Sequence, residues 1–138
     1  VRNNLHSTFY LMREAYNQWM AKHGGSIVNM TADMWGGMPG MGHSGAARSG
    51  VDNLTKTASV EWGKSGVRVN AVAPGGVDTT MMRGGQDDAA LAAFVAMIPM
   101  GRLARPDEMS GAVLFLASDA SSYMTGTVLN VSGGQLMY

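Results

Sequence analysis

The fold is decided by residues 43–79, which read HSGAARSGVDNLTKTASVEWGKSGVRVNAVAPGGVDT. The first half carries apolar side chains at helical spacing, at Ala47, Val51, Leu54 and Ala58. This pattern predicts an amphipathic helix over residues 44–62, which Gly63 ends. Residues 67–73 are a β-branched run and predict a buried strand that Pro74 stops. A helix that leads straight into such a strand is typical of a parallel sheet covered by helices.

The same patterns predict further helices and strands on both sides of this stretch. Helices are expected over residues 5–22, 86–98 and 105–118, strands over residues 26–30 and 127–131, and a loop over residues 33–43. Strands that alternate with helices indicate an α/β fold with a three-stranded parallel sheet, covered by helices on both faces. Ile27 and Val28 would lie on an exposed edge of that sheet.

The composition limits the class of protein. The chain has 138 residues, of which 46% are hydrophobic and 14% charged, and its formal net charge is zero. This is enough for one domain with a core. The sequence has no basic stripe for nucleic acid and no apolar run of the roughly 20 residues that span a membrane. Cysteine is absent, which excludes disulfides and thiolate metal ligands and fits a cytoplasmic location. We expect no metal site, no nucleic-acid partner and no membrane association.

Four separated segments, in the right order, resemble the C-terminal half of a short-chain dehydrogenase/reductase. They are Asn3-Asn4-Leu5 with Thr8-Phe9, Ile27-Val28-Asn29-Met30, Val67-Arg68-Val69-Asn70 with Pro74-Gly75, and Thr125-Gly126 with Gly133-Gly134. The resemblance implies one partial Rossmann-type domain over residues 1–138, the C-terminal half of a doubly wound parallel sheet. Nothing in the sequence corresponds to the glycine-rich phosphate turn on the family's first strand. We therefore expect the N-terminal dinucleotide-binding half to be absent, and this chain alone to bind a dinucleotide weakly.

A literal Gly-x-Gly-x-x-Gly does occur, at Gly40, Gly42 and Gly45. This motif holds a pyrophosphate where it directly follows a strand, so that N–H groups at a helix start meet the phosphates. About nine residues separate it here from the predicted strand over residues 26–30. We interpret it as a loop that enters the next helix.

Two segments carry a narrower resemblance within the superfamily. Residues 43–56 and the ending over residues 133–138 are similar to those of peroxisomal-type trans-2-enoyl-CoA reductases. Together with 2,4-dienoyl-CoA reductases, these relatives imply an NAD(P)H-dependent oxidoreductase that reduces enoyl-CoA or similar conjugated thioesters. They also imply NADP(H) in preference to NAD(H), an acyl-CoA-like substrate from fatty acid metabolism, and a homo-oligomer, either a dimer or a tetramer.

The catalytic helix is where the chain departs from the family. Most members carry Tyr-x-x-x-Lys there, and in this chain Ser44 and Arg48 keep that spacing, which places both on one helix face. Arg48 is a permanent cation that can hold ribose or phosphate oxygens but cannot shuttle protons, and the Ser44 hydroxyl can donate a hydrogen bond. His43 is the nearest group that titrates near neutral pH. By resemblance, Asn4 matches an asparagine that holds a water for proton relay, and these four residues form the predicted catalytic set.

The resemblance supplies the other site residues. The family's segment that walls the nicotinamide matches Pro74, Gly75, Gly76, Val77 and Thr79, which with Arg48 form the predicted cofactor set. The predicted substrate set is Thr31, Ala32, Asp33, Met81 and Met82. The family's carbonyl-polarising serine maps to Ala32, and the upstream tyrosine of 2,4-dienoyl-CoA reductases maps to Asp33. These losses favour hydride addition to a conjugated double bond, because its enolate needs only hydrogen-bond donors.

Two alternatives stay open. One is a non-catalytic fragment or degenerate paralogue that acts as an assembly partner, since the helices over residues 5–22 and 44–62 match helices that contact a second subunit in the family. The other is a carbonyl or alcohol dehydrogenase of the same superfamily.

Overall fold

The computed structural model describes residues 1–85 and 87–135. Three parallel strands form one sheet in the order β1-β2-β3, and their bounds are Gly25–Met30, Val67–Pro74 and Val128–Val131. Each strand differs by a single residue at one end from the strand that the sequence predicts. The predicted parallel sheet is therefore confirmed.

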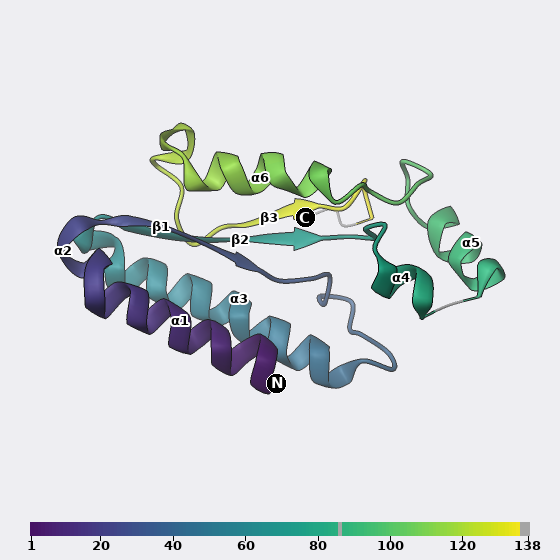
Figure 1. The fold of residues 1–138 in the computed structure, drawn as a ribbon, viewed down its shortest axis with the longest axis horizontal. Coiled ribbons are helices and arrows are strands. Elements are labelled where there is room, and N and C mark those ends of the chain that lie inside the picture. Colours follow the sequence, from purple (N-terminus) through teal and green to yellow (C-terminus); the bar gives the residue numbers. More distant parts are fainter. Residues whose placement is uncertain (86, 136–138) are drawn as a thin grey trace.

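Helices cover both faces of the sheet. Figure 1 shows α1 (Ser7–Ala15) and α3 (Gly42–Trp62) below it and α6 (Asp107–Ala117) above it. The smaller helices α4 (Thr80–Gly84) and α5 (Asp88–Ala96) lie beyond the carboxyl end of β2. The predicted α/β fold, half of a doubly wound sheet, is confirmed in this arrangement.

β2 is the central strand and is buried between the helical layers. Its Val67 and Val69 side chains are fully buried and join Ala58 of α3 in one apolar cluster. β1 pairs with β2 on one side, and no strand among residues 1–85 and 87–135 pairs with its other side. The predicted edge position of Ile27 and Val28 is therefore confirmed, and both side chains are half-buried.

The first helical stretch starts earlier than the sequence predicts. It consists of η1 (Arg2–His6), α1, η2 (Tyr16–Met20) and α2 (Ala21–His23), and the two η segments are π-helical turns. It ends at Gly24, whose φ of 71° is a conformation that favours glycine. A Cβ on Gly24 would lie 2.9 Å from the carbonyl oxygen of Gly66. The glycine thus allows the helix end to approach the turn before β2.

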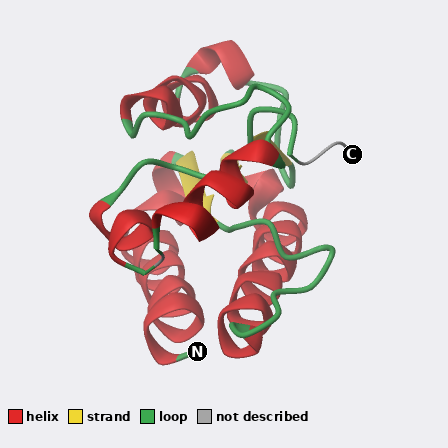
Figure 2. Ribbon diagram, turned by 90° about the vertical axis from the view of Figure 1, so that its right-hand side faces the viewer, coloured by secondary structure: helices red, strands yellow, loops and turns green. Residues whose placement is uncertain are grey.

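α3 begins two residues before its predicted start and ends at the predicted residue. Figure 2 shows the two long helices side by side beneath the sheet. Near the C-terminal ends of the first helical stretch and of α3, the Tyr16 ring stacks on Trp62 at 4.4 Å between centroids. The Tyr16 hydroxyl also shares a 2.9 Å hydrogen bond with the Ser65 Oγ. Residues 31–41 separate β1 from α3, so the Gly-x-Gly-x-x-Gly motif does not directly follow a strand, as predicted.

The C-terminal part contains one helix that the sequence analysis missed. This is α4, which the Thr79 side chain caps by accepting the N–H of Met82 at 3.2 Å. Helices α5 and α6 fall within the predicted ranges 86–98 and 105–118, and η4 (Asp119–Ser121) follows α6. Two predicted segments extend beyond the described residues. These are the helix over residues 86–98, in which residue 86 is not described, and the ending over residues 133–138, in which residues 136–138 are not described.

Candidate active site

A cavity of about 470 Å³ lies at the carboxyl ends of β1 and β2. It is lined by every residue of the predicted cofactor and substrate sets, namely Thr31, Ala32, Asp33, Arg48, Pro74, Gly75, Gly76, Val77, Thr79, Met81 and Met82. Segments far apart in the sequence converge here because the carboxyl ends of parallel strands meet at one edge of the sheet. The placement brings these residues together, and their roles stay predictions.

Sequence reasoning missed part of the lining. The additional residues are Gly37, Met38, Pro39, Met41, Phe94 and Gln135. The repeated methionines of the loop over residues 31–41 are the signal that could have identified Met38 and Met41. Phe94 and Gln135 reach the cavity through tertiary packing, for which the sequence gives no local signal.

The two glycines of the turn after β2 lie where little room is left for a side chain. A Cβ on Gly75 would lie 2.8 Å from the Cα of Ser132, and a Cβ on Gly76 would lie 2.5 Å from the Cε1 of Phe94. The Gly76 carbonyl accepts the N–H of Ala104 at 2.9 Å, which ties the turn to the segment before α6. This wall of the cavity is therefore a backbone surface held in place from both sides.

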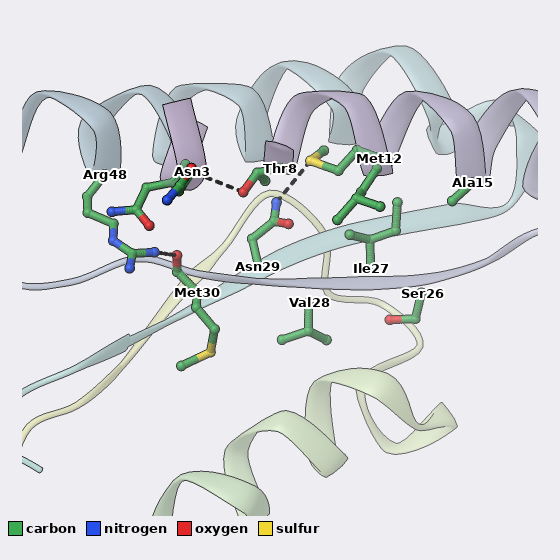
Figure 3. Close-up of a pocket in the computed structure, with 12 residues that line it drawn as sticks. Asn3, Thr8, Met12, Ala15, Ser26, Ile27, Val28, Asn29, Met30 and Arg48 are labelled. Atoms are coloured by element: carbon green, nitrogen blue, oxygen red, sulfur yellow. Dashed lines mark hydrogen bonds between the residues drawn. The ribbon is translucent and has the colours of Figure 1, made fainter. Parts of the chain in front are cut away.

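Arg48 lies between the cavity and a second hollow, a groove of about 460 Å³ along the free edge of β1. Its Nη1 donates to the carbonyl oxygen of Met30, the last residue of β1, at 2.6 Å. Figure 3 shows the guanidinium reaching from α3 to that oxygen at one end of the groove. Because a guanidinium has five N–H donors, one bond to the strand leaves capacity to bind an anion.

The structure places the other predicted catalytic residues away from the cavity. Asn4 lines the groove. Ser44 lies half-buried in the first turn of α3, where its backbone N–H donates to Met41 at 2.8 Å, and His43 is exposed. Ser44 and His43 line neither hollow. Of the predicted catalytic set, the geometry joins Arg48 to the cavity, and the roles of the other three stay predictions.

The described lining of the cavity contains one carboxyl. Asp33 and Arg48 are the charged side chains among the described residues that line it. Burial raises the pKa of the Asp33 carboxyl above its ordinary value. The neighbouring Thr31 is buried, and both its hydroxyl and its N–H donate to the carbonyl oxygen of Val72, at 3.3 and 2.9 Å. The Thr31 hydroxyl is thus engaged with the backbone of β2.

An ion-paired loop supports the cavity from the α6 side. Arg102 donates to both carboxylate oxygens of Glu108, at 2.7 and 2.8 Å, and the backbone N–H of Arg105 donates to the same carboxylate at 2.7 Å. The Arg102 hydrogen bond, followed by that of the Arg105 backbone, lowers the pKa of Glu108 to about 2. The loop also donates the Met100 N–H to the Gly133 carbonyl at 3.1 Å. These bonds fix the segment that packs under the glycine turn.

One buried acceptor in the cavity has no partner among the described residues. It is the Oε1 of Gln135, which lies so close to the glycine turn that a Cβ on Gly75 would be 3.0 Å from it. A buried acceptor without a donor costs free energy unless water or a ligand supplies one. This acceptor, the backbone wall and the Arg48 cation fit a ligand with an amide N–H and anionic oxygens, which are the groups at the nicotinamide end of a dinucleotide.

Residues 1–85 and 87–135 contain no group of three or more His, Asp or Glu side chains that could hold a metal ion. They also contain no helix long and apolar enough to cross a bilayer.

Comparison with protein families matches nearly the whole chain. Residues 1–135 fit the family model described as enoyl-(acyl carrier protein) reductase. The sequence is 45% identical over 130 residues to a peroxisomal 2,4-dienoyl-CoA reductase of Danio rerio, an alignment that covers 92% of this chain and 43% of the relative.

Solved structures also match nearly the whole chain. A citronellol catabolism dehydrogenase of Pseudomonas aeruginosa PAO1 superposes with a TM-score of 0.84 at 48% identity, covering 97% of this chain and 52% of the neighbour. A protein of Agrobacterium tumefaciens proposed to be a 2-deoxy-D-gluconate 3-dehydrogenase, solved with bound NADP, gives a TM-score of 0.88 at 34% identity, covering 96% and 55%. The chain thus spans about half the length of the proteins that it matches.

Proposed function

The chain belongs to the short-chain dehydrogenase/reductase superfamily, and on that premise we propose that it forms the catalytic and substrate-binding half of an NAD(P)H-dependent oxidoreductase. The proposed reaction is reduction of a carbon–carbon double bond conjugated to a thioester, as in an enoyl-CoA. The observation that carries the proposal is the cavity at the strand ends, where the predicted cofactor and substrate sets converge.

The polar groups of the cavity favour an alkene over a carbonyl substrate. Reduction of a carbonyl needs an acid that protonates the oxygen as hydride arrives. No tyrosine, histidine or lysine occurs among the described residues that line the cavity, and the Thr31 hydroxyl is engaged with Val72. The one carboxyl of the described lining, Asp33, follows Ala32, which offers no second donor to polarise a carbonyl oxygen. Addition of hydride to a conjugated alkene develops its charge on the thioester oxygen, where hydrogen-bond donors suffice.

The dinucleotide would supply the hydride, and this chain would supply the nicotinamide end of its site. Gly75 and Gly76 would present a flat backbone wall to the ring, the Gln135 Oε1 would accept a carboxamide N–H, and Arg48 would hold ribose or phosphate oxygens. We favour NADP(H) over NAD(H), because a structural neighbour carries bound NADP.

The apolar side of the cavity suits an acyl chain. Met38, Met41, Met81, Met82 and Phe94 line it, and flexible thioether side chains adapt to apolar ligands of different shape. The name of one matched protein, a 2,4-dienoyl-CoA reductase, also refers to an acyl-CoA. We propose an acyl-CoA-like substrate on these grounds.

Turnover with matched thioesters tests the reaction type. Loss of NADPH absorbance is measured with a 2-enoyl-CoA and with a 3-oxoacyl-CoA of the same chain length. We expect the enoyl thioester to turn over at least roughly tenfold faster, a barrier difference of about 1.4 kcal/mol. Faster turnover of the 3-oxoacyl thioester would instead support the carbonyl reductase alternative. Calorimetric binding of both thioesters in the absence of dinucleotide tests the same preference without hydride transfer.

We also propose that the protein is a homo-oligomer. An apolar groove of about 340 Å³ separates the outer surfaces of α1 and α3, lined by Leu5, His6, Phe9, Tyr10, Gly50, Asn53 and Leu54. Exposed aromatic side chains such as Tyr10, which is 52% exposed, are enriched where protein surfaces associate. The same surface favours the second candidate function, a non-catalytic assembly partner. Light scattering on the purified chain should give a dimer or tetramer mass, and a monomer would argue against both ideas.

We propose a cytoplasmic location, supported by the lack of cysteine in the sequence. A matched relative is peroxisomal by name, so cell fractionation distinguishes the two compartments. Recovery of the protein with peroxisomes would contradict the proposal.

A further inference from the structure

We propose that Asp33 is the catalytic acid that protonates the α-carbon of the substrate. This inference rests on the proposed function, and it assigns the proton to a side chain that lines the cavity, whereas Ser44 and His43 are not among its lining residues.

Asp33 is placed by the end of β1. The strand ends at Met30, and the chain continues along the cavity through Thr31, Ala32 and Asp33. The opposite wall is the turn after β2, which begins at Pro74. A thioester bound between these walls would lie against Ala32, which has no polar group, and against the Asp33 carboxyl beside it.

The other polar groups of the described lining do not suit the role. Arg48 does not deprotonate in proteins and is already bonded to the Met30 carbonyl. The Thr31 hydroxyl donates to Val72. The Thr79 hydroxyl caps α4, and neither it nor the Gln135 amide titrates in the physiological range. Asp33 is left as the one titratable acid in the described lining.

The electrostatic setting agrees with this geometry. Burial disfavours the ionised carboxyl and raises the Asp33 pKa, which is the direction that a proton donor needs at neutral pH. Arg48 is the other charged group that lines the cavity. Asp78, which follows β2, and Arg83 of α4 form an ion pair with each other.

The proposed step balances in atoms and electrons. The β-carbon would receive a hydride from a reduced nicotinamide dinucleotide, and the electron pair of the double bond would move onto the α-carbon and thioester oxygen. The O–H bond of Asp33 then breaks as a C–H bond forms at the α-carbon, which leaves a saturated thioester and an Asp33 carboxylate. Solvent water reprotonates the carboxylate.

The reverse proton transfer tests Asp33 without any dinucleotide. A 3-enoyl-CoA has α-protons that its neighbouring double bond acidifies, so a carboxylate in the cavity can exchange them with solvent. Purified chain is incubated with trans-3-decenoyl-CoA in D₂O, and mass spectrometry follows deuterium at the α-carbon. We expect Asp33→Asn to slow the exchange by roughly 10²- to 10⁴-fold, Asp33→Glu to restore part of it, and the exposed control Asp107→Asn to leave it unchanged.

Calorimetric binding of the same thioester separates the possible failures. If Asp33→Asn binds the thioester like the wild type but loses exchange, Asp33 is the acid. Undiminished exchange in Asp33→Asn overturns the assignment, as does a wild type that binds the thioester without exchanging its α-protons. A wild type that does not bind the thioester at all overturns the proposed function, and the Asp33 assignment with it.

Discussion

The cavity at the strand ends and the groove along β1 have nearly equal volumes, about 470 and 460 Å³, but they are built differently. The cavity is lined by five separate parts of the chain, namely residues 31–41, Arg48, residues 74–82, Phe94 and Gln135. The groove is walled by β1, the N-terminal helical stretch and Arg48 of α3, and Leu11 in its wall is 71% exposed. The cavity therefore collects chemically different side chains at one point, whereas the groove follows from the unpaired edge of β1.

Arg48 connects the two hollows, because its side chain lines both and donates to the Met30 carbonyl oxygen at the end of β1. If the cavity is the functional site, changes to its wall should affect packing and thioester binding together. Matched changes in the groove should affect neither. The following variants test this contrast, beginning with the largest expected effect.

Substitution of Gly76 by valine should have the largest effect. A Cβ there would lie 2.5 Å from Phe94 and 3.0 Å from Leu103, so Gly76→Val overpacks the wall and should lower the free energy of unfolding by about 1–3 kcal/mol. Urea denaturation measures the change. Leu11→Ala in the groove wall should alter stability by less than about 0.5 kcal/mol. Equal effects of the two variants would contradict the contrast.

A glycine with open space around it provides the control for Gly76. Gly111 lies in α6, and nothing lies within 4 Å of its added Cβ. Gly111→Ala should therefore leave stability unchanged or raise it by up to about 1 kcal/mol, because alanine loses less backbone entropy in a helix.

Loss of the Arg48 side chain should have a smaller effect on stability. Arg48→Met keeps the aliphatic stem but removes the 2.6 Å bond to the Met30 carbonyl, which should cost about 1 kcal/mol. Arg48→Lys keeps the positive charge without the planar donor group, so its free energy of unfolding should lie between those of the wild type and Arg48→Met. If urea denaturation gives Arg48→Met the same free energy of unfolding as the wild type, the bond does not stabilise the packing of β1 against α3.

Removal of the Glu108 charge should mainly change how the stability of the fold depends on pH. The folded-state pKa of Glu108 is about 2, below its ordinary value of 4.5, because Arg102 and the Arg105 N–H bind its carboxylate. This contribution to stability is fully present above pH 4.5 and is lost as the pH falls towards 2. Glu108→Gln should therefore lower the midpoint of thermal unfolding at pH 7 and flatten its dependence between pH 5 and pH 2.

The neighbouring carboxylate gives a matched control for Glu108. Asp107 pairs with Arg105 at 3.1 Å, but both side chains are mostly exposed, and such pairs contribute little. Asp107→Asn should leave the thermal midpoint at pH 7 unchanged. A larger loss in Asp107→Asn than in Glu108→Gln would contradict the assigned role of the Arg102–Glu108 pair.

The sequence predicts the strands well because β-branched runs bounded by glycine and proline leave few alternatives. All three strands were located to within one residue. The short helix α4 was missed because it spans five residues, and its signal is the single capping residue Thr79. The π-helical turns at Arg2–His6 and Tyr16–Met20 also have no local sequence signature.

The sequence predicts the site residues that directly follow a strand. It does not predict the residues that reach the cavity only through tertiary packing. The predicted residues after β1 and β2 all line the cavity, because the position of a strand end fixes where the chain goes next. Asn4 and Ser44 were expected in the same site, but the groove holds Asn4, and Ser44 lies half-buried at the start of α3. Helical spacing correctly related Ser44 to Arg48, but it carries no information on which of the two reaches the cavity.

Methionine methyl NMR tests the central claim, that the cavity rather than the groove binds the thioester substrate. Met38, Met41, Met81 and Met82 line the cavity, whereas Met12 and Met30 line the groove. The chain is labelled with ¹³C at the methionine methyl groups, assigned by single substitutions, and titrated with trans-2-decenoyl-CoA. We expect the four cavity signals to shift together and the two groove signals to stay in place. Shifts confined to Met12 and Met30, or no shift at saturating thioester, would contradict the account.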